Sequence, residues 1–563
     1  MQKTNQTSEA VVSVVMSATS AFAQDFNKGV GAYNAGDYAT ALQEFRPLAE
    51  QGVASAQYNL GIMYENGQGV PRDDAEAVKW YRLASEQGVA SAQYNLGIMY
   101  ENGQGVPRDD AEAVKWYRLA SEQGYGSALM TLSSMYEQGI SVEEDTEKAL
   151  SLLYQAADQN DAAAFNRLGY LHAVGQYVEK NLGAAVEFHK LAAQQGFSNS
   201  QCDLGRHYAH GIGVEQNLAE AQRWYRLAAQ AGQTLAQHSL AGLLFNSHNP
   251  HRDTSEGMQW LEAAAEAGVV KAQYEAGSLK LGNTFPELED FQGAEFWLTN
   301  AAKNGSAEAL YQIGNCFEHG VGVEQNYAAA VHNYFEALKK DNTEAAFALG
   351  TLYEHGLGVE KDLTNALKCY GIAADKFHVS ALFNKGRFYQ FGWAEKADYA
   401  MAHHHYLMAA ERGHKMCQFL VGQALLNGAE GVTIDLSGGA SWVLSAAEAG
   451  LAEAQAVVGF CYLSGKGVGK DFKEALRWSR LAAEQGHAWA QCRTAHILIR
   501  FGDKGEAEFR EAIKWLILSY NQSEGEDERR HEFIKSDYEY LRSALPKPIF
   551  EAACKAVEIN THA

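Results

Sequence analysis

The histidine run at residues 403–405 is the feature of this sequence that most suggests metal chemistry. His403, His404 and His405 are consecutive, and His414 follows in the next segment. Three successive helical side chains point about 100° apart, so they cannot bind one ion together. His405 also occupies a position where comparable segments carry Trp, which predicts that it packs inward. We expect no metal site here, and no cofactor site elsewhere in the chain.

A glycine-rich run, GFCYLSGKGVGK, could suggest a phosphate-binding loop. Five residues rather than four separate Gly459 from the pair Gly465-Lys466, and Gly467 stands where Ser or Thr is required. Because the run also coincides with a loop that recurs throughout the chain, we reject the phosphate-loop interpretation.

The remaining acid and base residues recur, whereas a catalytic constellation is usually singular. His210, His319 and His355 each precede a glycine, which predicts a helix C-terminus where His can cap carbonyl groups. The acids Asp73, Asp74, Asp109 and Asp110 also recur, and we interpret them as helix caps. No nucleophile stands beside a dedicated base, so an enzyme is not expected.

The elements that carry these residues are copies of one repeat. Residues 51–86 and 87–122 are identical at all 36 positions, and weaker copies follow with a period of 36 or 37 residues. A shorter half-unit precedes them. The thirteen repeats begin at Val53, Val89, Tyr125, Asp161, Phe197, Gln233, Val269, Ser306, Asn342, His378, His414, Leu451 and His487.

Each repeat reads as two helices joined by a loop. In the first segment, small residues such as Ala56 and Gly61 share a helical face with an aromatic such as Tyr64. The second segment carries a Trp, as at Trp80, followed four residues later by Ala84. The loop between them, ENGQGVPRDD, has glycines suited to left-handed backbone. Neither helix can bury its apolar face alone, so the repeats must stack.

The pattern A-x3-LG-x2-Y-x2-G-x-GV…D-x3-A-x2-WY-x2-A-x3-G resembles the Sel-1-like repeat, a relative of the tetratricopeptide repeat. The resemblance implies an all-α solenoid, a right-handed superhelix of about thirteen helix–loop–helix repeats. The loop glycines are lost in the repeats at Gln233 and Val269, where we expect a bend or an irregular loop. Some family members carry a regular Cys pair in each repeat, and this pairing is missing here. We interpret the seven cysteines (Cys202, Cys316, Cys369, Cys417, Cys461, Cys492 and Cys554) as buried thiols.

Composition and the N-terminal segment limit the classes of partner and the cellular location that we expect. Lys and Arg number 46 against 69 Asp and Glu, a net charge of −23 without a basic stripe, so nucleic acid is not expected as a partner. No stretch is long enough for an integral membrane segment. Residues 1–23 resemble an export signal ending in Ala21-Phe22-Ala23, which favours a periplasmic or secreted protein. The alternative is a capping helix in a cytoplasmic protein.

We divide the chain into the signal at 1–23, a tetratricopeptide-like half-unit at 24–52, the repeat array at 53–524, and a charged linker with a C-terminal capping helix at 525–563. A monomeric, non-enzymatic scaffold that holds a protein or peptide in a concave groove is the favoured function. By helical geometry, the groove-facing candidates are Tyr58, Asn59, Tyr94, Asn95, Tyr170, Arg206, Tyr311, Asn315, Asn384 and Arg387. The other interpretation of Tyr58 and Tyr94 is that they brace adjacent helices. The alternative functions are the regulatory subunit of an enzyme complex and a glycan-binding envelope protein.

Overall fold

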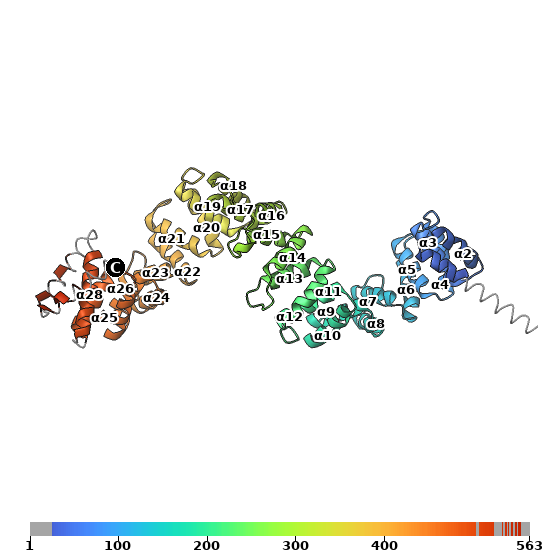
Figure 1. Cartoon of the computed structure of the whole chain (residues 1–563), viewed down its shortest axis with the longest axis horizontal. Helices are drawn as coiled ribbons and strands as arrows, with labels where there is room; N and C mark the ends of the chain where they lie inside the picture. Colours follow the sequence, from blue (N-terminus) through green and yellow to red (C-terminus); the bar gives the residue numbers. More distant parts are fainter. Residues whose placement is uncertain are drawn as a thin grey trace, which may run out of the picture. The chain divides into compact units, whose positions relative to one another are not determined.

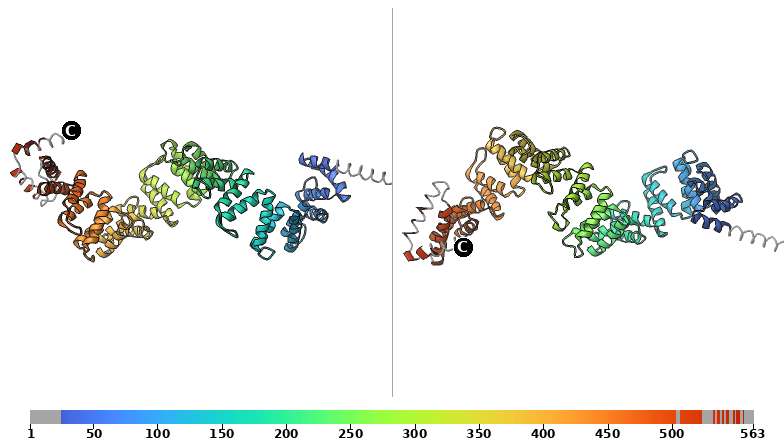
Figure 2. Two further views of the ribbon diagram at one scale, coloured as in Figure 1. Left: turned by 90° about the horizontal axis from the view of Figure 1, so that it is seen from below. Right: turned by 45° about the horizontal axis from the view of Figure 1, so that its top comes forward.

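The structure, a computed structural model, describes residues 25–502, 506–522 and scattered positions from 532 to 555. The chain forms two compact bodies, residues 1–272 and 273–563, and each is a stack of helix pairs joined by short loops (Figure 1). Views from two further directions show the same succession of pairs within each body (Figure 2). The described residues contain no strand, only one isolated bridge between Ala429 and Val432. The expected all-α solenoid of helix pairs is confirmed.

Every repeat contributes a first helix and a second helix. Residues 25–34 are helical and precede α2 (Tyr38–Glu50). The first helices are α3 (Ala54–Asn66), α5 (Ala90–Asn102), α7 (Gly126–Gln138), α9 (Ala162–Val174), α11 (Ser198–His210), α13 (Thr234–Phe245), α15 (Val270–Leu279), α17 (Ala307–His319), α19 (Thr343–His355), α21 (Val379–Phe391), α23 (Lys415–Asn427), α25 (Ala452–Ser464) and α27 (Ala488–Phe501). The second helices are α4 (Asp74–Glu86), α6 (Asp110–Glu122), α8 (Thr146–Asp158), α10 (Leu182–Gln194), α12 (Leu218–Gln230), α14 (Thr254–Glu266), α16 (Phe291–Lys303), α18 (Tyr327–Lys339), α20 (Leu363–Asp375), α22 (Tyr399–Ala410), α24 (Leu436–Glu448), α26 (Phe472–Glu484) and α28 (Glu506–Gln522).

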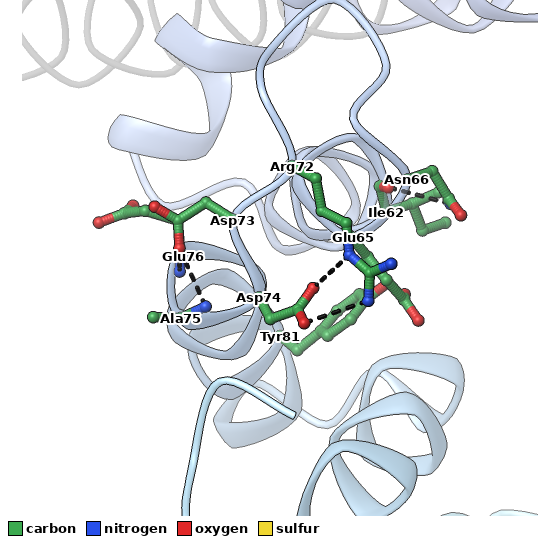
Figure 3. A network of polar contacts seen from close by, with 9 residues as sticks. All are labelled: Ile62, Glu65, Asn66, Arg72, Asp73, Asp74, Ala75, Glu76 and Tyr81. Carbon is green, nitrogen blue, oxygen red and sulfur yellow. Dashed lines mark hydrogen bonds and ion pairs between the residues drawn. The ribbon is translucent and has the colours of Figure 1, made fainter. Parts of the chain in front are cut away.

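The interhelical loop fixes where both helices end and begin. Gly67 closes α3 with a left-handed φ of 66°, and its N–H donates to the Met63 carbonyl. Asp73 opens α4 by accepting hydrogen bonds from the backbone N–H groups of Ala75 and Glu76 (Figure 3). Because these residues recur, the same loop geometry recurs along both bodies.

The second loop glycine, Gly105 in the second repeat, has a left-handed backbone and also lies very close to the neighbouring second helix. Gly105 has a φ of +68°, and a Cβ added to it would lie 2.2 Å from the Asp74 carbonyl oxygen of the preceding repeat. No side chain fits at that distance. Glycine at this position therefore lets the loop of the second repeat rest directly on the first turn of α4.

The core between the two helices of a repeat contains a glycine facing a tyrosine ring. Tyr81 is fully buried, and a Cβ on Gly61 would lie 2.6 Å from that ring. The same arrangement recurs at Gly97 with Tyr117. The recurring Trp position of the second helix is only half-buried at Trp80, so the principal core ring is the following residue, Tyr81.

Two repeats depart from the regular loop, as expected from their lost glycines. The helix α13 ends at Phe245, and the buried side chain of Asn249 caps it by donating to the Leu243 carbonyl over 2.9 Å. Within the C-terminal body, a short 3-10 helix, η1 (Pro286–Leu288), replaces the glycine turn between α15 and α16. Irregular loops are thus confirmed at both places.

The expected signal at 1–23 and Cys554 lie outside the described residues, as does most of the segment 525–563. Among the helices that the structure describes, none has the length and apolar character needed to cross a bilayer.

Candidate interaction surface

All ten candidate residues lie on first helices, from α3 to α21. Successive first helices contact one another through side chains of these positions. Tyr94 of α5 approaches Thr131 of α7, with 3.5 Å between their hydroxyl oxygens, and Ser200 of α11 donates to Asn166 of α9 over 2.8 Å. These contacts join α5 to α7 and α9 to α11 in the N-terminal body.

Three of the candidate tyrosines brace helices. The ring of Tyr94 lies 5.5 Å from Tyr117 in its own repeat and 5.4 Å from Tyr125 in the next. Tyr58 packs on Tyr81 with ring centroids 6.0 Å apart. Tyr311 makes the same contact with its own repeat's second helix, and burial raises the pKa of its phenol. These contacts support the bracing interpretation that the sequence left open.

The candidate asparagines lie beside the buried tyrosine hydroxyls. Asn95 is within hydrogen-bonding reach of Tyr81, and Asn384 is within reach of Tyr370 in the preceding repeat. Asn315 has the same relation to the tyrosine of its own repeat. Asn59 is half-buried at the position equivalent to Asn95. The side chains of Asn95, Asn315 and Asn384 therefore connect the core tyrosines to the first-helix face.

The sequence interpretation missed the polar pair that organises this face. Tyr81 donates to Glu65 over 2.5 Å, and Tyr117 donates to Glu101 over 2.6 Å. Burial, together with the neighbouring carboxylate, raises the pKa of the Tyr81 phenol far above its usual value. The signal was present in the sequence, because the Tyr after the Trp position and the Glu near the end of the first helix recur at fixed spacing.

The exposed candidates are Tyr170 and Arg206. The guanidinium of Arg167 lies 5.1 Å from the centre of the Tyr170 ring. Arg206 is exposed and donates to Asp203 over 2.8 Å. Neither side chain belongs to the core, so both are available to a partner.

Arg387 is more enclosed than these two. Its guanidinium lies 4.8 Å from the ring centre of Trp393 and 3.7 Å from the carboxylate of Glu354 in the preceding repeat. It links two repeats of the C-terminal body, and its role as a contact residue stays a prediction.

The structure assigns the other chemical candidates to structural roles. His319 and His355 bond the carbonyl four residues earlier at 3.1 and 2.8 Å, which confirms them as caps, and His210 ends α11. His405 is buried and stacks on Tyr389, as expected. In the described part of the chain no His, Cys, Asp and Glu side chains group as a metal site. The cysteines other than Cys554 are buried free thiols.

The recurrent aspartates divide into two roles. Asp73 and Asp109 are N-caps, as predicted. Asp74 and Asp110 are not: each forms an ion pair with the arginine two residues before it, Arg72 in the first case (Figure 3). The cap needs a residue just outside the helix, whereas Asp74 is the first helical residue.

Two cavities stand out by the residues that line them. One, of about 450 Å³, lies in the C-terminal body beside the irregular loop and is mostly apolar, with Leu281, Leu298 and Phe317 among its lining residues. The other, of about 530 Å³, opens among α7, α8 and α9 and includes polar side chains of the first-helix face. The second cavity therefore belongs to the candidate surface.

Comparison with known proteins agrees with this architecture. The family model described as Sel1 repeat matches residues 54–89, 90–125, 126–161, 162–197, 198–233, 234–269, 270–306, 307–342, 343–376, 379–414, 415–451, 452–487 and 490–524. The chain is 28% identical to c5321, described as a protective antigen present in uropathogenic Escherichia coli strains displaying an SLR fold. That comparison covers 88% of this chain and 97% of the other, with a TM-score of 0.58.

Two further similarities are more limited. A Sel1 repeat protein from Oxalobacter formigenes is 31% identical, with 43% of this chain and 96% of the other covered and a TM-score of 0.39. The curated DAP3-binding cell death enhancer 1 of Mus musculus is 39% identical over 66 residues, which are 12% of this chain. The match spans only 13% of that mouse protein's length.

Proposed function

Because the chain belongs to the Sel1 repeat family, we propose that it is a monomeric scaffold that binds a protein or peptide along its first helices. The Sel1 repeat solenoid is a fold typical of protein–protein interaction scaffolds, and proteins built from it are generally non-catalytic. The observation that carries the proposal is the N-terminal first-helix face, where Tyr170 and Arg206 are exposed. A cavity lined by both polar and apolar side chains opens on the same body among α7, α8 and α9. Aromatic and arginine side chains are the residues that dominate binding energy in protein interfaces.

The bacterial envelope or the host interface is the proposed location. The Ala21-Phe22-Ala23 export pattern supports it, and so does the likeness to a protein described as a protective antigen of uropathogenic strains. Protease protection in intact cells, compared with lysed cells, tests this location. Degradation only after lysis of both membranes would contradict it.

Glycan binding has less support than protein binding. A glycan site would present Trp rings along a groove, whereas Trp224, Trp297 and Trp478 are buried on second helices. These rings fill packing positions. A regulatory-subunit role remains the alternative, and an enzyme recovered as the partner would support it.

The test is affinity capture with the intact chain, followed by identification of the captured protein and measurement of its affinity. We expect Tyr170→Ala and Arg206→Ala each to weaken that complex more than about tenfold, as hot-spot truncations do. Arg223→Ala is the matched control, since Arg223 is equally exposed and forms the same kind of i,i+3 ion pair, but on the second helix α12. Equal losses for Arg206→Ala and Arg223→Ala, or no loss in either first-helix variant, would contradict the proposed face.

A further inference from the structure

Within the part of the chain that the structure describes, a bond between a buried core residue, a tyrosine, and a first-helix side chain recurs in five repeats. The phenol hydroxyl, carried by the second helix, donates to the next-to-last residue of the first helix. The five pairs are Tyr81 with Glu65 (2.5 Å), Tyr117 with Glu101 (2.6 Å), Tyr334 with Glu318 (2.6 Å), Tyr370 with Glu354 (2.7 Å) and Tyr406 with Gln390 (2.6 Å). The phenol therefore fills the space between the core and the first-helix face.

The repeat at Tyr125 keeps the acid of this pair but lacks the phenol. Glu137 stands at the acid position, while Leu153 replaces the tyrosine and Ser133 replaces the facing glycine. The two replacements compensate each other: a Cβ at the glycine position would lie about 2.6 Å from a tyrosine ring, as Gly61 shows, so Ser133 requires the shorter Leu153. The Ser133 hydroxyl is already engaged, because it donates to the Ala149 carbonyl over 2.7 Å.

The cavity of about 530 Å³ lies at this position. Its lining includes Ser133, Ser134, Glu137 and Leu153 together with Arg167 of the next repeat. Met130 and Phe197 add apolar surface. The site thus combines an apolar wall with one partly buried carboxylate, at the point where other repeats hold a phenol.

The charge of this carboxylate is already balanced. Arg167 donates to Glu137 Oε1, and within the described residues this is the carboxylate's one hydrogen bond. Oε2 is left to accept from a ligand. A second cation would meet the Arg167 guanidinium, whereas a neutral hydroxyl donor would not. The chemistry favours a neutral donor carried on an apolar ring.

We propose that this cavity, hereafter the Glu137 pocket, binds the phenol side chain of a tyrosine in a partner protein. The ring would contact Leu153, Met130 and Phe197, and the hydroxyl would donate to Glu137, which repeats within a complex the bond that five repeats make internally. The inference rests on the proposed scaffold function and specifies which side chain of the partner is recognised.

The probe is p-cresol, the side-chain analogue of tyrosine, with toluene as the analogue that lacks the hydroxyl. Saturation-transfer difference NMR on the full-length protein measures both dissociation constants. We expect p-cresol to bind several-fold more tightly than toluene, since the hydroxyl satisfies a partly buried carboxylate. Equal affinities of the two probes would overturn the assignment of a phenol.

The decisive variant is the double substitution Ser133→Gly with Leu153→Tyr, which restores the arrangement of the other repeats and fills the pocket. We expect it to fold and to weaken p-cresol binding more than about tenfold. The matched control makes the same kind of change in a repeat that lacks the carboxylate. It is Ala241→Gly with Leu261→Tyr, in the repeat where Phe245 stands at the position equivalent to Glu137. Unchanged p-cresol affinity in the Ser133/Leu153 variant, or an equal loss in the control, would refute the pocket.

A second variant keeps the test decisive if the double substitution fails to fold. Ser134→Trp changes an exposed lining position and should obstruct the pocket without altering the core, so retained p-cresol binding would again refute the proposal. The scaffold function is tested separately. A partner that is captured equally by the wild type and by the Ser133/Leu153 variant would refute the phenol pocket and leave the scaffold intact, whereas failure to capture any partner would contradict the scaffold itself.

Discussion

A buried histidine pair should make the N-terminal body locally sensitive to mild acid. His189 stands at the core tyrosine position of its repeat, and His207 of the next repeat lies against it, with 3.1 Å between His189 Nδ1 and His207 Nε2. His207 Nδ1 donates to the Ile212 carbonyl over 2.7 Å. Because a carbonyl only accepts, His207 Nε2 must accept in turn, and His189 Nδ1 carries the donated proton.

The geometry leaves His189 Nε2 as the site for an added proton. It faces the carboxylate of Asp203 at 3.9 Å, with Arg206 and the Asn166 backbone also near the ring. Burial is the largest effect on this imidazole and lowers its pKa from 6.5 to about 4, while Asp203 opposes the shift. Burial also lowers the pKa of His207.

The sign follows from linkage. The unfolded segment takes up a proton near pH 6.5 and the folded segment only near pH 4, so unfolding binds protons between these values and stability falls as the pH falls. At one pKa unit per 1.36 kcal/mol, His189 alone costs about 2 kcal/mol between about pH 7.5 and pH 5, roughly thirtyfold in the opening equilibrium. The contribution levels off as the pH falls through the folded pKa of about 4, and it is nearly constant below about pH 3.

The assay is hydrogen exchange by mass spectrometry on peptides from α10 and α11, corrected for the intrinsic pH dependence of exchange. Local opening is the appropriate measurement because repeats contact mainly their neighbours. The control variant replaces His189 by Tyr and His207 by Met. These are the residue types at the equivalent positions of the first repeat, Tyr81 and Met63. Wild-type protection should fall roughly thirtyfold more than that of the variant. An equal fall in both proteins would refute the reasoning, because the histidine pair would then not be the acid-sensitive element.

Three further predictions concern the stack. Deleting residues 87–122, an identical copy of the preceding 36 residues, should leave a folded protein, since the new junction reproduces an existing one; loss of helical circular dichroism or of a cooperative melt would show otherwise. Trp224→Ala should cost on the order of 3–5 kcal/mol in urea unfolding because the ring is buried, whereas Arg206→Ala should cost under about 0.5 kcal/mol; comparable losses would place Arg206 in the core. Gly97→Ala should cost about 1–3 kcal/mol, since the new Cβ would lie 2.5 Å from the Tyr117 ring. Adding Tyr117→Leu should relieve that clash, so the double variant should lose less free energy of unfolding than the sum of the two single variants. Losses that simply add would contradict the predicted clash.

Helix boundaries could be predicted from the sequence because local backbone chemistry determines them. Gly67 ends α3 and Asp73 begins α4 as their residue types indicate. The assignment of Asp74 to a cap was wrong, since only the residue just outside the helix has the required geometry and Asp74 lies one place too far along.

The core ring could not be chosen from the sequence pattern alone. Trp80 and Tyr81 are adjacent aromatic residues that both recur, and successive positions on a helix differ in direction by about 100°. Only the packed helix pair shows that Tyr81 enters the space above Gly61, while Trp80 stays half-buried. Tyr94 shows the same limit. Helical geometry predicted that it faces the open groove, whereas in the structure its ring packs against two neighbouring tyrosines.

The sequence by itself determined the repeat, its period, its helix pairs and the face that first helices share, because each depends on residue types at short, fixed spacing. The tertiary structure decided which members of that face remain available. Tyr58 braces a second helix, Tyr170 is exposed, and the space beside Glu137 opens because Leu153 is shorter than the tyrosine that other repeats carry. Whether a side chain on this face is exposed depends on how much of the adjacent space the neighbouring helix fills. That volume is set by the side chains of both packed helices, so the residue pattern of one segment does not determine it.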